Sequence, residues 1–246
     1  MREIPKIVHY CWFGNGEKPD NIKAYIETWK SKMPDYTFME WNEQNFDVDK
    51  SVPYVRQAYE AKKYAFVSDY VRIQALYQLG GVYFDTDVEV KKSFEEFLEN
   101  KSMVLGFESA RSLLTAFIAV EKEHPYIGEF LESYDDRDFL KEDGSYDMTV
   151  INDVFSSFME SKGVDLNRNE YQELPGNIAV YPEEYFCGFD VNNWHESITD
   201  KTCTVHYMNS SWVSGKQGMK RKIIYTLQKI LGYKNYDRLR ERLKGK

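Results

Sequence analysis

Two aspartates one residue apart, Asp85 and Asp87, are the residues of this sequence best suited to chemistry. Carboxylates and diphosphate oxygens are hard ligands, which suit Mg²⁺ or Mn²⁺ better than soft metals. A cation held by them would neutralise the charge that grows on a departing diphosphate, which is Lewis-acid activation of a leaving group. Asp-x-Asp is also an ordinary acidic turn, so the surrounding residues must decide between the two interpretations.

The residues before this pair predict elements that would present it. Residues 68–90, SDYVRIQALYQLGGVYFDTDVEV, read as an amphipathic helix, a glycine pair that ends it, and a short β-prone run. Asp69 and Arg72 share one face of that helix. The alternative for them is a surface salt bridge worth less than about 1 kcal/mol. Because successive strand residues point to opposite faces, Asp85 and Asp87 can converge only if the strand breaks into a turn there.

The same segment resembles the signature of the DXD-containing glycosyltransferases. That family includes fungal outer-chain mannosyltransferases and bacterial capsular-polysaccharide transferases, and the glucosylating domains of clostridial toxins carry a related pattern. Two further blocks agree with the resemblance. Residues 4–14, IPKIVHYCWFG, look like the family's first strand and nucleotide loop, and residues 206–212, HYMNSSW, look like the end of its catalytic region. The three blocks follow each other in the family's order.

The resemblance implies a role for several residues around the cation. Asp87 would bind the cation directly, and Asp85 would contact the ribose or reach the cation through water. His206 and Ser210 are candidates to complete the metal shell, because a neutral imidazole suits Mn²⁺. Trp212 would donate its indole N–H to the β-phosphate from a loop that closes over the donor.

The resemblance also implies contacts to the rest of a nucleotide sugar. Trp12 would stack on the uracil or guanine ring, with a core tryptophan as the alternative. Asp69 would accept hydrogen bonds from the sugar hydroxyls, and Arg72 would donate to sugar or phosphate oxygens. Tyr83 is a candidate to lie along the ribose, and the alternative is a buried strand tyrosine. His9 is interpreted as structural because it is embedded in the first strand.

Three more residues are weaker candidates. Asn152 and Asp153 fall where the family commonly places residues near the donor sugar or the acceptor, but the Thr-Gly-Pro found in many relatives is missing here. Glu108 follows an expected strand and could line the acceptor side. A solvated turn glutamate is the simpler interpretation of Glu108.

Composition bounds the class of protein. The chain has 246 residues, 42% of them hydrophobic and 29% charged, which fits one soluble globular domain with a sizeable core. It contains no run of 18 apolar residues and no apolar segment at its start, so we expect neither a transmembrane helix nor a signal peptide. The cysteines are three in number and far apart, which predicts buried free thiols rather than a disulfide framework or a zinc site: Cys11, Cys187 and Cys203.

Charge is distributed unevenly along the chain. Residues 216–246 contain eleven Lys and Arg against two acids, a net charge of +9, whereas the whole chain has −8 and the remainder therefore −17. We divide the chain into a catalytic domain, residues 1–215, and a basic amphipathic helical tail, residues 216–246. The acidic body argues against nucleic acid as a partner. A peripheral contact of the tail with the inner face of the membrane is the expected alternative to a packed terminal helix with solvated charges.

Alternation of strands and helices indicates an α/β fold. Together with the resemblance it predicts a GT-A-type, Rossmann-like nucleotide-sugar-binding fold with a mostly parallel central sheet and a C-terminal helical tail. In such sheets the ligand lies at the carboxyl ends of the strands. Strands are expected at residues 4–12, 36–41, 103–107, 178–181 and 202–207, and residues 113–121 are ambiguous between strand and helix. Helices are expected at residues 20–32, 52–63, 65–79, 125–134 and 149–162.

Together with the resemblance, these observations predict a metal-dependent glycosyltransferase whose reaction depends on Asp69, Arg72, Asp85 and Asp87. The resemblance also implies that the anomeric configuration is retained. The expected donor is a nucleotide sugar, with a UDP-sugar favoured, and the cation is Mn²⁺ or Mg²⁺. The expected acceptor is a saccharide or lipid-linked oligosaccharide in the synthesis of a capsular or other cell-surface polysaccharide, on the cytoplasmic side. Retention could follow a double displacement or a same-face attack. Three alternatives are a nucleotide-sugar-binding protein without turnover, a phosphohydrolase and a toxin-like protein glucosyltransferase.

Overall fold

The computed structural model describes residues 3–190 and 195–208 of the chain. Its helices are α1 (Asp20–Lys32), α2 (Pro53–Glu60), α3 (Tyr64–Leu79), α4 (Glu95–Leu98), α5 (Pro125–Glu132), α6 (Ile151–Ser161) and α7 (Glu183–Phe186). Its strands are β1 (Ile7–Cys11), β2 (Thr37–Trp41), β3 (Gly81–Phe84), β4 (Val88–Val90), β5 (Met103–Ser109), β6 (Ser112–Val120), β7 (Gln172–Leu174), β8 (Ile178–Tyr181), β9 (Phe189–Asp190), β10 (His195–Glu196) and β11 (Thr204–His206).

Seven strands form the central sheet, in the order β2-β1-β3-β6-β5-β8-β7. The strands β2, β1, β3, β5 and β8 run in one direction, and β6 and β7 run against them. The predicted α/β class with a mostly parallel sheet is therefore confirmed. The ambiguous residues 113–121 form β6, the long antiparallel strand at the centre of the sheet.

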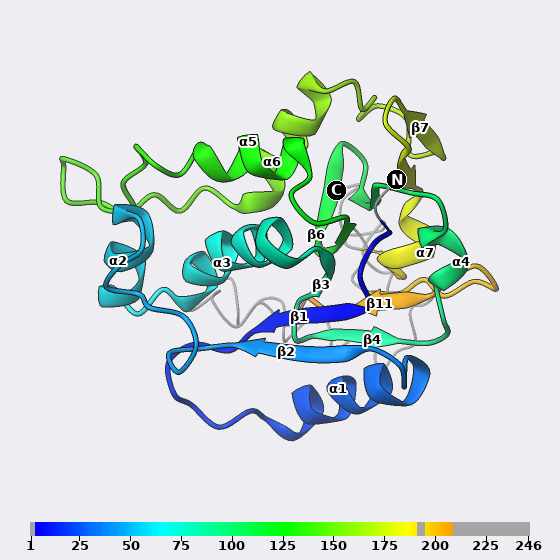
Figure 1. Ribbon diagram of the computed structural model, residues 1–246, viewed down its shortest axis with the longest axis horizontal. Helices are drawn as coiled ribbons and strands as arrows, with labels where there is room; N and C mark the ends of the chain where they lie inside the picture. The colour runs from blue at the N-terminus through cyan, green and yellow to red at the C-terminus, as the bar shows by residue number, and fades with distance from the viewer. Residues whose placement is uncertain (1–2, 191–194, 209–246) are drawn as a thin grey trace, which may run out of the picture.

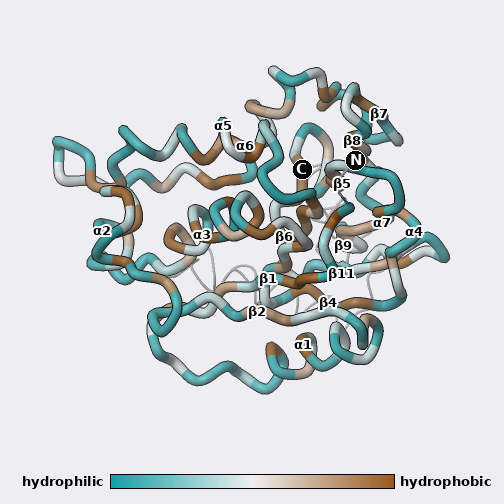
Figure 2. The backbone as a smooth tube through the Cα atoms, in the orientation of Figure 1, coloured by the Kyte–Doolittle hydropathy of each residue, from teal (hydrophilic) through white to brown (hydrophobic). Residues whose placement is uncertain are grey.

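Helices cover both faces of this sheet (Figure 1). The side of α3, α5 and α6 holds one apolar cluster, to which the sheet contributes Tyr83, Leu105 and Ile118. The side of α1 holds a second cluster, which contains Val82 and Phe84 from the same strand, β3. Alternate residues of β3 thus enter opposite clusters, as the two-residue period of a strand requires. Figure 2 shows the hydrophobic residues gathered on the central strands, with hydrophilic residues on the outer loops.

The glycine pair between α3 and β3 allows the close approach of β3 to β1. The N–H of Gly80 donates to the carbonyl of Leu76 and caps the helix. Gly81 has a φ of +109°, which L side chains rarely adopt, and a Cβ there would lie 2.5 Å from the carbonyl oxygen of Ile7. Only glycine therefore fits at the start of β3, the strand that leads to the two aspartates.

The chain turns after Phe84 and leaves the central sheet. The N–H of Val88 donates to the carbonyl of Asp85 at 3.1 Å, which closes a turn through residues 85–88. The strand β4 that follows pairs antiparallel with β11, in a separate two-stranded sheet in which His206 lies opposite Val88. The expected break between the aspartates is confirmed, and the turn brings them beside a residue more than a hundred positions later.

The last two expectations concern membrane-spanning helices and the basic tail. Within the described ranges, no helix is both long and apolar enough to cross a membrane. The basic tail, residues 216–246, lies outside those ranges, so its predicted helix remains a prediction.

Candidate metal and nucleotide-sugar site

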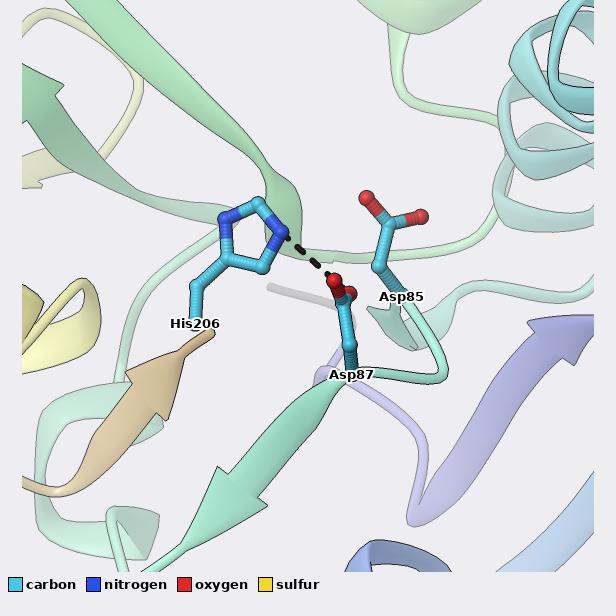
Figure 3. A group of neighbouring side chains, drawn as sticks. All are labelled: Asp85, Asp87 and His206. Atoms are coloured by element: carbon cyan, nitrogen blue, oxygen red, sulfur yellow. Dashed lines mark ion pairs between the residues drawn. The ribbon is translucent and has the colours of Figure 1, made fainter. Parts of the chain in front are cut away.

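Three side chains converge beyond the end of β3. Asp85, Asp87 and His206 each offer a ligand atom, and these three atoms lie within 4.8 Å of one another. Figure 3 shows the two carboxyl groups rising from the turn and the imidazole reaching them from the end of β11. The Nε2 atom of His206 lies 3.3 Å from Oδ1 of Asp87. The structure thus brings together the two aspartates and the histidine that the sequence proposed as metal ligands.

The electrostatics of His206 reveal the preference of this cluster for positive charge. Burial by itself would lower the pKa of His206, but the carboxylates of Asp87, Asp85 and Glu108 outweigh it and raise the pKa to about 9. A divalent cation would meet the same surplus of negative charge. Two carboxylates and an imidazole form a donor set that suits Mn²⁺, and Mg²⁺ with more water ligands, so the residues fit the expected cation.

Arg72 connects Asp85 with α3 and β6. Its Nη2 atom donates to Oδ1 of Asp69 at 2.8 Å and lies 3.2 Å from Oδ1 of Asp85, and its Nη1 atom donates to the carbonyl of Thr115 at 2.9 Å. Asp69 and Arg72 are 7% and 5% exposed, so their interpretation as a surface salt bridge is wrong. Burial raises the pKa of Asp69 to about 6, although the Arg72 guanidinium opposes that rise.

Tyr83 supports the same group from inside the sheet. Its ring is buried, the guanidinium carbon of Arg72 lies 4.6 Å from the ring centroid, and its hydroxyl donates to Oδ1 of Asp85 at 3.0 Å. The alternative of a buried strand tyrosine is therefore the better description. One carboxylate oxygen of Asp85 is held by both Tyr83 and Arg72, which fixes its position in the turn.

Glu108 belongs to this site, and the interpretation of a solvated turn glutamate is wrong. Its side chain is only 19% exposed, and its Oε1 atom lies 3.9 Å from Nδ1 of His206. Burial raises its pKa, against the opposing effect of the nearby imidazole. The structural reason is that β5 runs in the same direction as β3, so its last residues reach the same edge of the sheet.

Asn152 lies beside Glu108, whereas Asp153 is exposed. The Asn152 side chain is hydrogen-bonded to Glu108, and its Oδ1 atom accepts a hydrogen bond from the Thr115 hydroxyl at 2.5 Å. Of the two weak candidates at the start of α6, the structure therefore brings only Asn152 to the group of polar side chains. No sequence signal marked Thr115, because it lies within a continuous apolar run.

The first strand ends at the same edge of the sheet. The N–H of Trp12 donates to the carbonyl of Trp41 at 2.9 Å, and its indole N–H donates to the carbonyl of Gly16 at 2.6 Å. Lys18 lies over the ring, with its Nζ atom 5.5 Å from the centroid. The indole of Trp12 is partly exposed at the carboxyl end of β1, where a nucleotide would lie in such a sheet.

His9 has a structural role, as expected. It is buried in β1, where Trp41 donates its indole N–H to Nδ1 at 3.2 Å and Nε2 lies 2.8 Å from the carbonyl oxygen of Gly80. The donation from Trp41 requires an unprotonated Nδ1, so Nε2 carries the proton and donates it to Gly80. Burial also lowers the pKa of His9, which keeps the ring neutral.

The remaining predictions fall into two groups. All three cysteines are buried free thiols, as predicted. Ser210 and Trp212 lie outside the described residues, so their roles remain predictions.

The fold and the site define an α/β protein with a candidate divalent-metal centre beyond the carboxyl end of β3, the edge at which ligands generally lie in open α/β sheets. Residues 19–104 match the family described as "Glycosyltransferase sugar-binding region containing DXD motif". This segment includes Asp69, Arg72, Asp85 and Asp87, so the resemblance noted in the sequence is confirmed there. Over residues 19–104 the chain is therefore similar to the DXD-containing sugar-binding region of this glycosyltransferase family.

Individual relatives agree with this family. The chain is 30% identical over 133 residues to the initiation-specific alpha-1,6-mannosyltransferase of Candida albicans, which covers 50% of this chain and 34% of that protein. It is 23% identical over 216 residues to inositol phosphoceramide mannosyltransferase 1 of Schizosaccharomyces pombe, covering 79% of this chain and 63% of that one. The chain thus spans less than two thirds of either relative.

Among solved structures, the chain is similar to the PaToxG glycosyltransferase, with a TM-score of 0.48 and 23% identity over 66% of this chain and 70% of that one. It is also similar to the galactosyltransferase LgtC, with a TM-score of 0.44 and 12% identity over 92% of this chain and 96% of that one.

Proposed function

We propose that this protein is a metal-dependent glycosyltransferase that moves a sugar from a nucleoside diphosphate to a saccharide or lipid-linked oligosaccharide. The observation that carries the proposal is the convergence of Asp85, Asp87 and His206 within 4.8 Å, next to the buried Arg72. This pairing of a hard-ligand cluster with a guanidinium suits a diphosphate that leaves with its negative charge.

The protein's own contribution is a set of charges held in place before the donor arrives. Arg72 is fixed by Asp69 and by the carbonyl of Thr115, so its guanidinium needs little reorganisation to meet a developing charge. Asp85 is fixed by Tyr83 and Arg72. When bound, Mn²⁺ or Mg²⁺ would supply the Lewis acid that stabilises the leaving diphosphate.

His206 has a specific proton requirement in this scheme. With its pKa raised to about 9, the imidazole carries a proton on both nitrogens, and therefore a positive charge, at neutral pH. Nitrogen ligates a metal only through a free lone pair, so Nε2 must lose its proton when the cation is bound. We expect retention of the anomeric configuration, by double displacement or by same-face attack.

The donor and the acceptor are proposed by class. A UDP-sugar is the first donor to test, and GDP-sugars are the second. Two relatives, inositol phosphoceramide mannosyltransferase 1 and lactosylceramide 4-alpha-galactosyltransferase, carry ceramide lipids in their names, which supports a lipid-linked saccharide as acceptor here. We place the reaction in cell-surface polysaccharide synthesis, on the cytoplasmic side of the membrane.

A panel of UDP- and GDP-sugars with Mn²⁺, scored by release of free nucleotide, tests the proposal. We expect one donor to be hydrolysed or transferred, and we expect Asp87→Ala to lower nucleotide release by about 100-fold or more. Asp200→Ala removes an exposed carboxylate and serves as the control. Binding of a nucleotide sugar without metal-dependent release would instead indicate the binding protein without turnover.

A further inference from the structure

The Nδ1 atom of His206 is a buried polar atom that needs a hydrogen-bond partner. The Nε2 atom of the ring faces Asp87, while the Nδ1 atom is buried and has no hydrogen-bond partner among the described residues. A buried polar atom without a partner is costly, and such atoms in native proteins usually have a functional reason. Oε1 of Glu108 lies 3.9 Å from Nδ1, which is just beyond hydrogen-bonding distance.

The side chain of Glu108 is held in place by neighbouring polar groups. Its carboxylate is hydrogen-bonded to the Asn152 side chain, and its Oε2 atom lies 3.5 Å from the Ser112 hydroxyl. Asn152 is in turn joined to Thr115, whose carbonyl accepts from Arg72. The polar groups therefore run without interruption from Arg72 to Glu108, and Glu108 is anchored at the end that meets His206.

We infer that Glu108 is a positioning residue that orients His206 for the divalent cation. The inference rests on the proposed function, because it assumes the metal centre of Asp85, Asp87 and His206. An imidazole that ligates through Nε2 carries its proton on Nδ1, and a carboxylate that accepts this proton fixes both the tautomer and the ring plane. A shift of about 1 Å brings the two groups within hydrogen-bonding distance.

Glu108 acts on the cation only through the imidazole in this arrangement. The ligand atoms of Asp85, Asp87 and His206 lie within 4.8 Å of one another, and Asp87 lies nearest Nε2 of the ring, whereas Glu108 lies nearest Nδ1. The network through Asn152 and Thr115 also links the orientation of His206 to the position of Arg72. The metal end and the phosphate-binding end of the site would therefore be ordered together.

Manganese affinity, measured by the electron paramagnetic resonance signal of free Mn²⁺, tests this role without turnover. Glu108→Gln keeps the shape of the side chain and removes its charge, and we expect it to weaken Mn²⁺ binding about 10- to 100-fold. Ser112→Ala leaves the carboxylate but removes one donor, and we expect a severalfold loss. Glu173→Gln changes an exposed glutamate of β7 and is the matched control, with unchanged affinity.

The Glu108→Gln change in a His206→Ala background separates positioning from other roles. If Glu108 acts through the imidazole, the second change costs no further Mn²⁺ affinity. A further loss there would show a direct ligand and overturn the inference, as would unchanged affinity in Glu108→Gln that folds with a normal thermal transition. If the wild type binds no Mn²⁺, or if Asp87→Ala does not weaken its binding, the metal centre fails and the inference fails with it. If the wild type binds Mn²⁺ and releases nucleotide while Glu108→Gln behaves like it, only the inference fails.

Discussion

Arg72 shows how one buried side chain can hold three parts of a site in register. A guanidinium presents five N–H groups in a rigid fork, and here they reach a carboxylate of the same helix, the turn after β3 and the backbone of β6. A lysine is also positively charged, but its three donors radiate from a single point. It therefore cannot span the same partners.

Replacing Arg72 by lysine should therefore destabilise the fold as well as the reaction. We expect Arg72→Lys to lower the free energy of unfolding by about 2–3 kcal/mol, because hydrogen bonds to buried charged groups are lost. Urea denaturation measures the change. Arg168→Lys alters an exposed pair with Glu170 and is the control, with less than about 1 kcal/mol expected. Equal losses in the two variants would contradict the role assigned to Arg72.

At the scale of single residues, the sequence predicted which side chains lie close together better than it predicted how deeply they are buried. Asp69 and Arg72 were identified, yet charged residues one helical turn apart usually mark a solvated face, and here both are buried. The interpretation of Glu108 as a solvated turn glutamate is wrong for a related reason. The burial of a carboxylate at a strand end depends on which strands neighbour it, and that pairing is not local in the sequence.

Among the elements, the glycine pair and the turn after β3 do most to place the carboxylates. The short β-prone run predicted β3 because it is bounded by clear signals, glycines before and aspartates after. The run that forms β6 remained ambiguous, since a strand buried on both faces has no alternation to distinguish it from a buried helix. The pairing of β4 with β11 was not predicted at all, because strands this short carry little signal.

Gly81→Ala tests whether the close approach of β3 to β1 supports the site. A Cβ would meet the carbonyl of Ile7 at 2.5 Å, so we expect a loss of stability beyond the roughly 1–2 kcal/mol that positive φ alone costs, and weaker Mn²⁺ binding. Gly176→Ala is matched, because Gly176 also has a positive φ but open space around it. Thermal unfolding and Mn²⁺ titration of both variants measure the difference, and similar results would refute this account.

For the whole molecule, the main feature that the fold does not explain is the uneven charge, with net negative charge in residues 1–215 and net positive charge in residues 216–246. The net charge of +9 in residues 216–246 suits an anionic lipid surface, which attracts clustered Lys and Arg by about 1 kcal/mol each near the surface. We propose that this segment brings the site to a lipid-linked acceptor. The packed terminal helix with solvated charges is the competing account.

Removing residues 216–246 should abolish sedimentation with vesicles that contain phosphatidylserine or phosphatidylglycerol, while hydrolysis of the donor in solution continues. Binding of the full chain should weaken steeply as salt rises, because the attraction is electrostatic. Vesicles of phosphatidylcholine alone control for non-specific sedimentation. Retention of vesicle binding by the truncated protein would exclude the tail as the membrane contact.

The pairing of β4 with β11 has a consequence for the order in which the site forms during synthesis of the chain on the ribosome. His206 reaches the two aspartates only because β11 pairs with β4, and these strands are separated by more than a hundred residues. Domains generally fold as units while the ribosome emits the chain from its amino terminus. A nascent polypeptide that has already presented Asp85 and Asp87 therefore lacks the imidazole until β11 emerges. The candidate metal cluster of Asp85, Asp87 and His206 is therefore complete only after β11 has been synthesised.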